Sequence, residues 1–92
     1  MSDRPVWRVE FDPDAARELR KLGHPARNEI QKYLRERIAT AEDPRRFGHA
    51  LLGDLKGLWR YRVGDYRIVA DIRDKEILVM VITVGHRRNV YD

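Results

Sequence analysis

Two hydrophobic periods divide the chain into a helical first half and a strand-rich second half. Apolar and polar residues alternate at the start of residues 5–11, which predicts a strand. Asp12-Pro13 then supplies an N-cap and a first helical residue, and apolar residues follow at helical spacing until Gly23 ends the helix. A second helix is predicted over residues 24–38, because four apolar residues four positions apart form one stripe: Ala26, Ile30, Leu34 and Ile38.

The second half predicts three consecutive strands after an irregular segment at residues 42–57. The strands are expected at residues 58–63, 66–73 and 76–84. Gly64-Asp65 between the first two suits a two-residue type II′ hairpin turn, because glycine comes first. Residues 76–84 are apolar on both faces, which predicts a strand inside the sheet.

These elements predict one α+β domain over residues 1–92. Counting chain reversals through the helical hairpin makes the first strand antiparallel to the last one. The expected architecture is therefore an N-terminal strand, a helical hairpin and an antiparallel three-strand meander. Together they form a four-stranded antiparallel sheet of order 1-4-3-2, with both helices on one face.

The composition narrows the function classes. Absence of cysteine excludes disulfides and thiolate metal sites, and the longest apolar run, residues 77–84, is far too short for a membrane span. With no apolar segment at the N-terminus, we expect a cytoplasmic protein. The net charge is +4, and residues 1–46 and 47–92 each contribute +2. An anionic partner is indicated, and any basic surface must be assembled by folding.

Alternation predicts where that basic surface forms. Within residues 58–63, Trp59, Tyr61 and Val63 share the face expected to pack under the helices, and Arg60 and Arg62 share the other. Arg67 follows the turn. A tail folded back over this face would add His86, Arg87, Arg88 and Tyr91. The sequence thus predicts a basic, aromatic-rimmed concavity that binds phosphate.

The stretch "LKGLWRYRVGDYRIVADI" followed by "VITVGHRRNVY" resembles the RelE family of toxin–antitoxin toxins over nearly the whole chain. The resemblance implies a RelE-like fold and a ribosome-dependent mRNA endonuclease (an mRNA interferase) that inhibits translation without a metal or other cofactor. It also implies a RelB-like antitoxin partner, whose complex with the toxin binds operator DNA through the antitoxin, besides the ribosome and mRNA.

The resemblance also implies the site residues. Arg60 and Arg62 match an alternating basic pair that is lysine in the best-known members, and further matches are Arg67, Arg87, Tyr91 and, in several relatives, His86. In such cleavage the 2′-hydroxyl attacks the adjacent phosphorus, through a pentacoordinate phosphorane. We expect Arg60, Arg62 and Arg67 to stabilise this phosphorane, and Arg87 to hold the phosphate or the leaving oxygen.

Arginine stays protonated, so the general base is left open between His86 and Tyr91. Lys56 and Arg88 are expected to bind RNA at the rim, whereas His24 and His49 are expected to have no catalytic role. No two histidines have the i, i+4 spacing of a zinc site. Alanine at Arg67 or Arg87 is expected to abolish cleavage and leave the fold intact.

Two alternatives remain. A ParE-like inhibitor of DNA gyrase would use the same fold without nuclease activity, although ParE-like chains generally lack this set of arginines and tyrosine. An inert domain that binds RNA or an antitoxin is the other.

Overall fold

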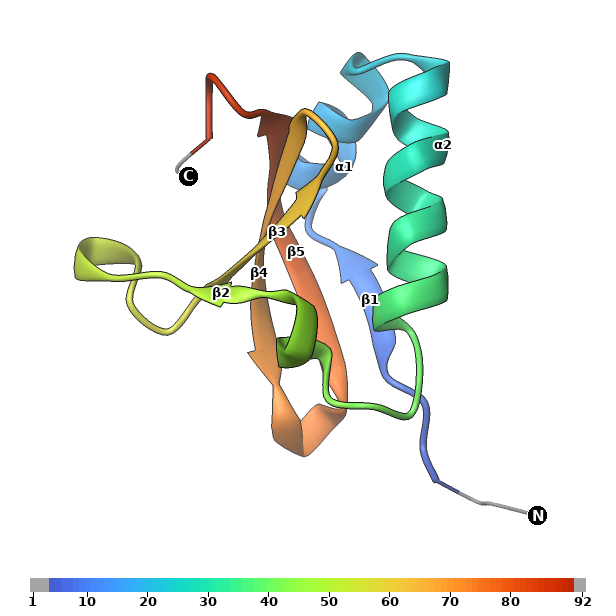
Figure 1. Ribbon diagram of the computed structural model, residues 1–92, viewed down its shortest axis with the longest axis vertical. Coiled ribbons are helices and arrows are strands. Elements are labelled where there is room, and N and C mark those ends of the chain that lie inside the picture. Colours follow the sequence, from blue (N-terminus) through green and yellow to red (C-terminus); the bar gives the residue numbers. More distant parts are fainter. Residues whose placement is uncertain (1–3, 91–92) are drawn as a thin grey trace.

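The structure, a computed structural model, describes residues 4–90 and packs a helical hairpin against a twisted sheet (Figure 1). The helices are α1 (Pro13–Lys21) and α2 (His24–Tyr33), and α2 continues as a π-helical turn, η1 (Leu34–Ile38). The strands are β1 (Arg8–Phe11), β2 (His49–Ala50), β3 (Trp59–Val63), β4 (Tyr66–Arg73) and β5 (Leu78–His86). Three 3₁₀ turns, η2 (Pro44–Phe47), η3 (Gly53–Leu55) and η4 (Asp74–Glu76), lie between strands or precede them.

The predicted helical hairpin is confirmed in its local chemistry. The Asp12 carboxylate accepts a hydrogen bond from the Ala15 amide at 2.8 Å and so caps α1. The four residues of the α2 stripe are all buried: Ala26, Ile30, Leu34 and Ile38. Within residues 4–90, neither helix is long and apolar enough to cross a membrane.

The predicted four-stranded sheet of order 1-4-3-2 is wrong. The sheet has five strands in the order β1-β5-β4-β3-β2, because His49–Ala50 pairs antiparallel with β3 and adds an edge strand. The first strand is also not antiparallel to the last. β1 runs parallel to β5, with Arg8 opposite Leu78 and Phe11 opposite Val81.

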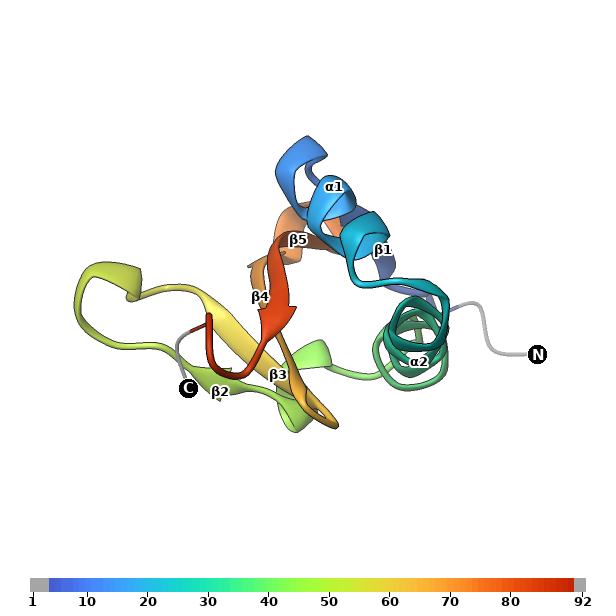
Figure 2. The same ribbon diagram turned by 90° about the horizontal axis from the view of Figure 1, so that it is seen from above.

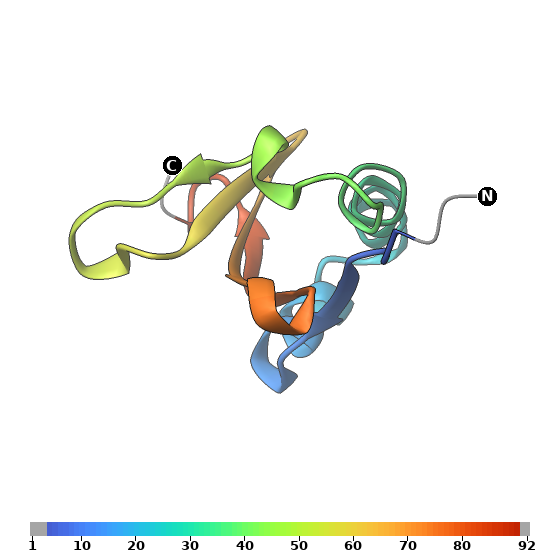
Figure 3. The same cartoon turned by 90° about the horizontal axis from the view of Figure 1, so that it is seen from below.

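One missed strand explains both errors. β2 has only two residues, too few for a visible alternation, so the sequence gives no period there. It adds one reversal between α2 and β3, and this reversal turns the predicted antiparallel pairing of β1 into a parallel one. β1 and β2 lie at opposite ends of the sheet (Figure 3). Beyond β2 the loop to β3 extends away from the body of the molecule (Figure 1), and Leu52 within it is 83% exposed.

Both helices lie on the same side of the sheet, and the core fills the space between them and the strands (Figure 2). The sheet contributes the face of β3 that carries Tyr61 and Val63, as alternation predicts. Burying this apolar surface is the main source of stability in a domain of this size.

The connection between β4 and β5 is longer than the predicted two-residue turn. Residues Asp74–Glu76 form η4, and Ile77 follows in the left-handed region with a φ of 50°. β5 therefore begins at Leu78 and runs through His86, two residues later at each end than predicted. The β3–β4 turn, by contrast, agrees with the predicted type II′ turn. Such a turn needs a positive φ at its first central residue only, and φ is 58° at Gly64 and not positive at Asp65.

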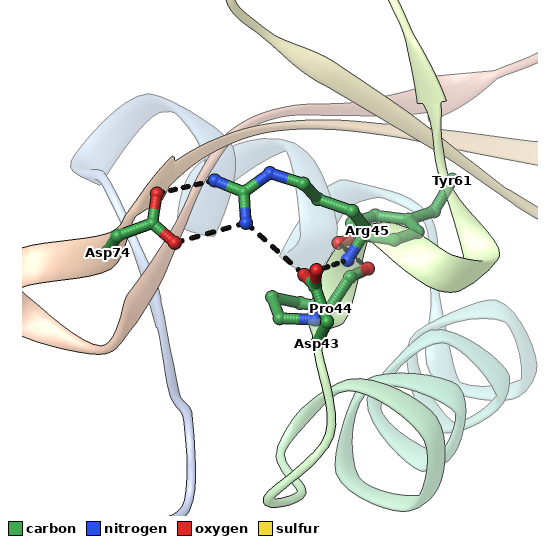
Figure 4. Close-up of polar contacts among 5 residues, drawn as sticks. All are labelled: Asp43, Pro44, Arg45, Tyr61 and Asp74. Carbon is green, nitrogen blue, oxygen red and sulfur yellow. Dashed lines mark hydrogen bonds and ion pairs between the residues drawn. The ribbon is translucent and has the colours of Figure 1, made fainter.

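A polar clasp fixes the segment between α2 and β2 (Figure 4). The Arg45 guanidinium donates two hydrogen bonds to the Asp74 carboxylate and another to Asp43, at 3.2 Å. The buried Tyr61 hydroxyl donates to the Pro44 carbonyl at 2.7 Å, and burial raises the pKa of Tyr61, so it stays protonated. The clasp thereby ties η2 to β3 and to the β4–β5 turn.

We expect Tyr61→Phe to destabilise the protein by about 1–3 kcal/mol, because the buried Pro44 carbonyl would lose its hydrogen-bond donor. Urea unfolding measures the change. Tyr33→Phe is the matched control, because the half-buried Tyr33 hydroxyl forms no hydrogen bond to residues 4–90. Equal stability of the two variants would contradict a structural role for the Tyr61 hydroxyl.

The Arg45–Asp74 pair predicts a pH dependence. Hydrogen bonds from Arg45 hold the pKa of Asp74 below its usual value, so the pair stabilises the fold at neutral pH and this contribution is lost as pH falls below about 4. We expect Arg45→Gln to lower the urea midpoint at pH 7 and to lower it less at pH 3. The Asp74 side chain is well exposed, so the effect is below about 1 kcal/mol. Arg35→Gln, which removes an exposed charge that has no ion pair within residues 4–90, should show no such trend. A pH-independent difference would rule out this pair as its source.

Candidate active site

Strand register brings the predicted arginines onto one face of the sheet. Residues directly opposite in antiparallel strands project to the same side. Arg62 is opposite Arg67, which is in turn opposite Gly85, and Arg60 is opposite both Val69 and His49. Arg60, Arg62 and Arg67 therefore share the face turned away from the Tyr61 core. We call it the arginine face.

The arginine face is less open than predicted. Arg60 is 7% exposed and Arg67 is 6% exposed, whereas Arg62 is exposed. Arg60 forms one wall of a hollow of about 400 Å³ whose other walls are residues 50–55. All three arginines have interaction partners, which offsets the cost of removing charge from water. The loop after β2 thus converts a flat sheet surface into a concave one.

Arg67 holds the hairpin as well as contributing charge. Its Nη1 donates to the Gly64 carbonyl at 3.0 Å and to the Tyr66 carbonyl at 2.9 Å. Alanine at Arg67 removes two hydrogen bonds from the β3–β4 turn, so we now expect this substitution to destabilise the fold. Arg87 makes only an exposed side-chain contact within residues 4–90, so its substitution is the better test of charge.

The chain after β5 turns across the end of the sheet toward the β3–β4 turn. The Arg87 amide donates to the Asp65 carbonyl at 2.8 Å, and its guanidinium lies 3.6 Å from the Asp65 carboxylate. A Cβ built on Gly85 would lie 2.7 Å from the Val90 side chain, and Gly85 faces the same way as Arg67. Figure 2 shows the tail leading from β5 toward β3, and Asn89 and Val90 also line a groove with residues of α1. Tyr91, the predicted aromatic rim and candidate base, lies outside the described residues.

His86 lies on the other face. It is opposite Tyr66, whose ring it meets edge-on with centroids 6.0 Å apart. It lines a groove with Glu18 and Lys21 of α1, not with the arginines. The Arg88 amide donates to Nδ1 of His86 at 3.3 Å. The structure therefore does not bring His86 together with Arg60, Arg62 and Arg67.

His49 is the histidine that the structure places on the arginine face. It is exposed in β2, directly opposite Arg60. Sequence reasoning missed it because the only signal was a two-residue strand in a segment without periodicity. Of the other predicted residues, Lys56 and Arg88 are exposed, Lys56 after η3 and Arg88 in the tail, and His24 is exposed at the start of α2.

Two acidic residues near the arginine face pair with other arginines. Asp71 pairs with Arg73 at 2.9 Å, and Asp65 lies 3.6 Å from Arg87 in an exposed contact. Within residues 4–90, no group of three or more histidine, aspartate or glutamate side chains is placed to hold a metal ion. A sheet face that carries three arginines beside a hollow is suited to binding phosphate oxygens in pairs and to stabilising extra negative charge on phosphorus.

Comparison with known proteins places this geometry in a family. The family model of the ParE toxin of type II toxin–antitoxin systems, parDE, matches residues 9–91. The mRNA interferase toxin RelE of Escherichia coli K12 is 36% identical over 81 residues, which cover 86% of this chain and 81% of that protein. Toxin RelE of Mycobacterium tuberculosis is 32% identical over 91 residues, which cover 99% and 92%.

Solved structures give the same result. The toxin–antitoxin complex RelBE2 from M. tuberculosis contains a chain that matches with a TM-score of 0.83 and 26% identity, covering 97% of this chain and 100% of that one. The isolated E. coli RelE toxin matches with a TM-score of 0.70 and 26% identity, covering 92% and 88%. The predicted resemblance is confirmed: this chain belongs to the RelE family of type II toxin–antitoxin toxins, within the RelE/ParE superfamily.

Proposed function

We propose that this chain is a toxin that inhibits translation by cutting mRNA on the ribosome through attack of the 2′-hydroxyl. The mRNA interferase activity follows from the family, since the E. coli relative named for it is 36% identical. The observation that supports the chemistry is the arginine face, which carries Arg60, Arg62 and Arg67 on one side of the sheet beside a hollow that Arg60 lines. Dependence on the ribosome is proposed because the face offers few acid–base groups of its own.

The arginines suit the charge-stabilising part of this reaction. The 2′ oxygen bonds to phosphorus, the bond from phosphorus to the 5′ oxygen breaks, and a 2′,3′-cyclic phosphate and a 5′-hydroxyl remain. The pentacoordinate intermediate carries extra negative charge, which preorganised guanidiniums stabilise. Arg87 can exchange its exposed contact with Asp65 for a phosphate or the leaving oxygen at little cost.

The proton must leave the 2′-hydroxyl for a base, and one must reach the 5′ oxygen. His49 enters as a candidate base because it is exposed beside Arg60. Tyr91 stays a candidate from sequence alone. His86 is disfavoured as the base, because it faces α1 and its Nδ1 already accepts a hydrogen bond.

An antitoxin is the proposed protein partner. RelE relatives are seen in complexes with RelB antitoxins from M. tuberculosis and E. coli. A domain of net charge +4 with a concave basic face suits an acidic or amphipathic segment of such a partner. Ribosome and mRNA binding, operator DNA bound through the antitoxin, and a cytoplasmic location belong to the same proposal.

A ParE-like inhibitor of DNA gyrase is the second candidate, because the matching family model is that of the ParE toxin. It needs no cleavage chemistry. The two functions differ in a single observation, since a gyrase inhibitor leaves mRNA intact and damages DNA.

Brief induction of the wild-type chain without antitoxin should arrest growth and produce new mRNA 5′ ends inside translated codons. Arg87→Ala should lose nearly all of these ends, because it removes the charge proposed to hold the phosphate or the leaving oxygen. The fold should survive, because the contact of Arg87 with Asp65 is exposed. Arg17→Ala on α1 should retain the ends. Mapping of mRNA 5′ ends is the measurement. Arrest with intact mRNA and DNA damage would favour gyrase, and equal cleavage by Arg87→Ala would remove Arg87 from the site.

His49→Gln should lower the cleavage rate by about 10²–10⁴-fold, because it removes the candidate base beside Arg60. His86→Gln is the matched control and should cleave as wild type, because His86 faces α1. Single-turnover cleavage of ribosome-bound mRNA measures both. An unchanged rate in His49→Gln would exclude His49 and leave Tyr91 as the candidate.

A further inference from the structure

A second basic surface lies between α2 and β2, built around the exposed aromatic ring of Phe47. The Arg46 guanidinium carbon lies 4.7 Å from the centre of this ring and that of Arg37 lies 5.3 Å from it. All three side chains are exposed, Phe47 by 37%. Within residues 4–90, neither Arg37 nor Arg46 takes part in an ion pair. We call these three residues the Phe47 patch.

The Phe47 patch is held rigidly from behind. In η2, Pro44 is buried and bound by Tyr61, while Arg45 is bound by Asp74 and Asp43 (Figure 4). Gly48 follows so closely against Trp59 and Tyr61 that an added Cβ would lie 3.3 and 3.1 Å from their rings. These contacts direct Arg45 inward and leave Arg46 and Phe47 outside.

Arg37 is fixed independently on the other side of the patch. It lies in η1, between the buried Leu34 and Ile38. Insertion of a π-helical turn changes which residues share a helix face, and such turns are frequent at functional sites. Two separate elements therefore present their guanidiniums to one ring.

The Phe47 patch continues into the arginine face. Arg37 and Arg62 line the same groove, whose other charged residues are Glu29, Glu36 and Lys32. Three cations against two carboxylates leave this groove positive. Phe47 also precedes His49 by only two residues, and His49 is opposite Arg60. The two basic surfaces are thus adjacent along both the chain and the groove.

We propose that the Phe47 patch binds the mRNA strand next to the scissile phosphate: Arg37 and Arg46 leave the ring for backbone phosphates, and a base stacks on Phe47 in their place. An exposed ring beside two exposed arginines that have no ion pair within residues 4–90 suits single-stranded nucleic acid, because every base has a face to stack and every linkage carries a charge. Because Arg37 of the patch and Arg62 of the arginine face line one groove, we assign both to the same RNA strand, the one that is cut. This inference rests on the proposed function and adds a binding site outside the cleavage site.

The test uses the full chain and 2′-O-methyl RNA, which cannot be cleaved through its 2′ position. Fluorescence anisotropy measures binding of a 12-nucleotide strand. We expect Phe47→Leu to weaken binding about tenfold and Phe47→Tyr to bind as wild type, because only the second keeps an aromatic face. Arg46→Gln should reduce the slope of log Kd against log salt by about 0.7, and should do so even if Phe47→Leu were to fold poorly. The control Arg20→Gln removes an exposed charge on α1 and should have a smaller effect.

Kinetics and alternative ligands separate the possible occupants. Cleavage of long ribosome-bound mRNA by Phe47→Leu should show a raised KM with kcat unchanged. Equal 12-nucleotide affinities of wild type and Phe47→Leu would overturn the proposal. Two other results would also overturn it. If Phe47→Leu weakened binding only to ribosomes that carry no mRNA, the patch would bind ribosomal RNA. If Phe47→Leu changed only neutralisation by the antitoxin, the patch would bind the antitoxin. A wild-type chain that binds RNA through Phe47 but cuts none would refute the proposed function and leave the patch standing.

Discussion

The register of the β3–β4 hairpin is the constraint on which the arginine face depends. A slip of one residue would move Arg60 and Arg62 to the core side and Tyr61 and Val63 to the other, so the register is fixed by the burial of one face. The turn enforces it locally. Gly64 adopts a φ of 58°, and a Cβ there would lie 2.8 Å from the Glu29 carboxylate of α2. Arg67 then closes the turn by binding the carbonyls on both sides of Asp65.

A second set of contacts decides what surrounds the arginines. The clasp of Arg45, Asp43 and Asp74 joins η2 to the far end of the sheet, and the Tyr61 hydroxyl joins it to β3. Fixed in this way, the chain can add β2 at the edge and continue into the loop that walls in Arg60. The same clasp sorts neighbouring residues, because Arg45 is turned inward while Arg46 and Phe47 face outward. One structural anchor thus shapes both the arginine face and the Phe47 patch.

Gly85 and His86, at the end of β5, lie on opposite faces of the sheet. Gly85 is opposite Arg67, and its lack of a side chain lets Val90 lie close to the strand. His86, the next residue, faces α1 and the ring of Tyr66. On the same α1 side, Glu18 accepts a hydrogen bond from the Val84 amide at 3.1 Å, beyond the point where β1 stops pairing with β5. The end of β5 is therefore held from both sides, and only one of them carries the arginines.

The sequence by itself determined the local elements and the side of the sheet on which the arginines lie. The Asp12 cap, the α2 stripe and the Gly64 turn each depend on interactions within a few residues, and the alternation in β3 depends only on which side chains avoid water. Membership of the RelE family could also be recognised from the sequence. Only the tertiary structure decided the strand count, the direction of β1, the burial of Arg60 and the separation of His86 from His49. Those depend on β2, whose two residues pair with β3 only because distant contacts, from Asp74 and Tyr61, hold the segment before it in place.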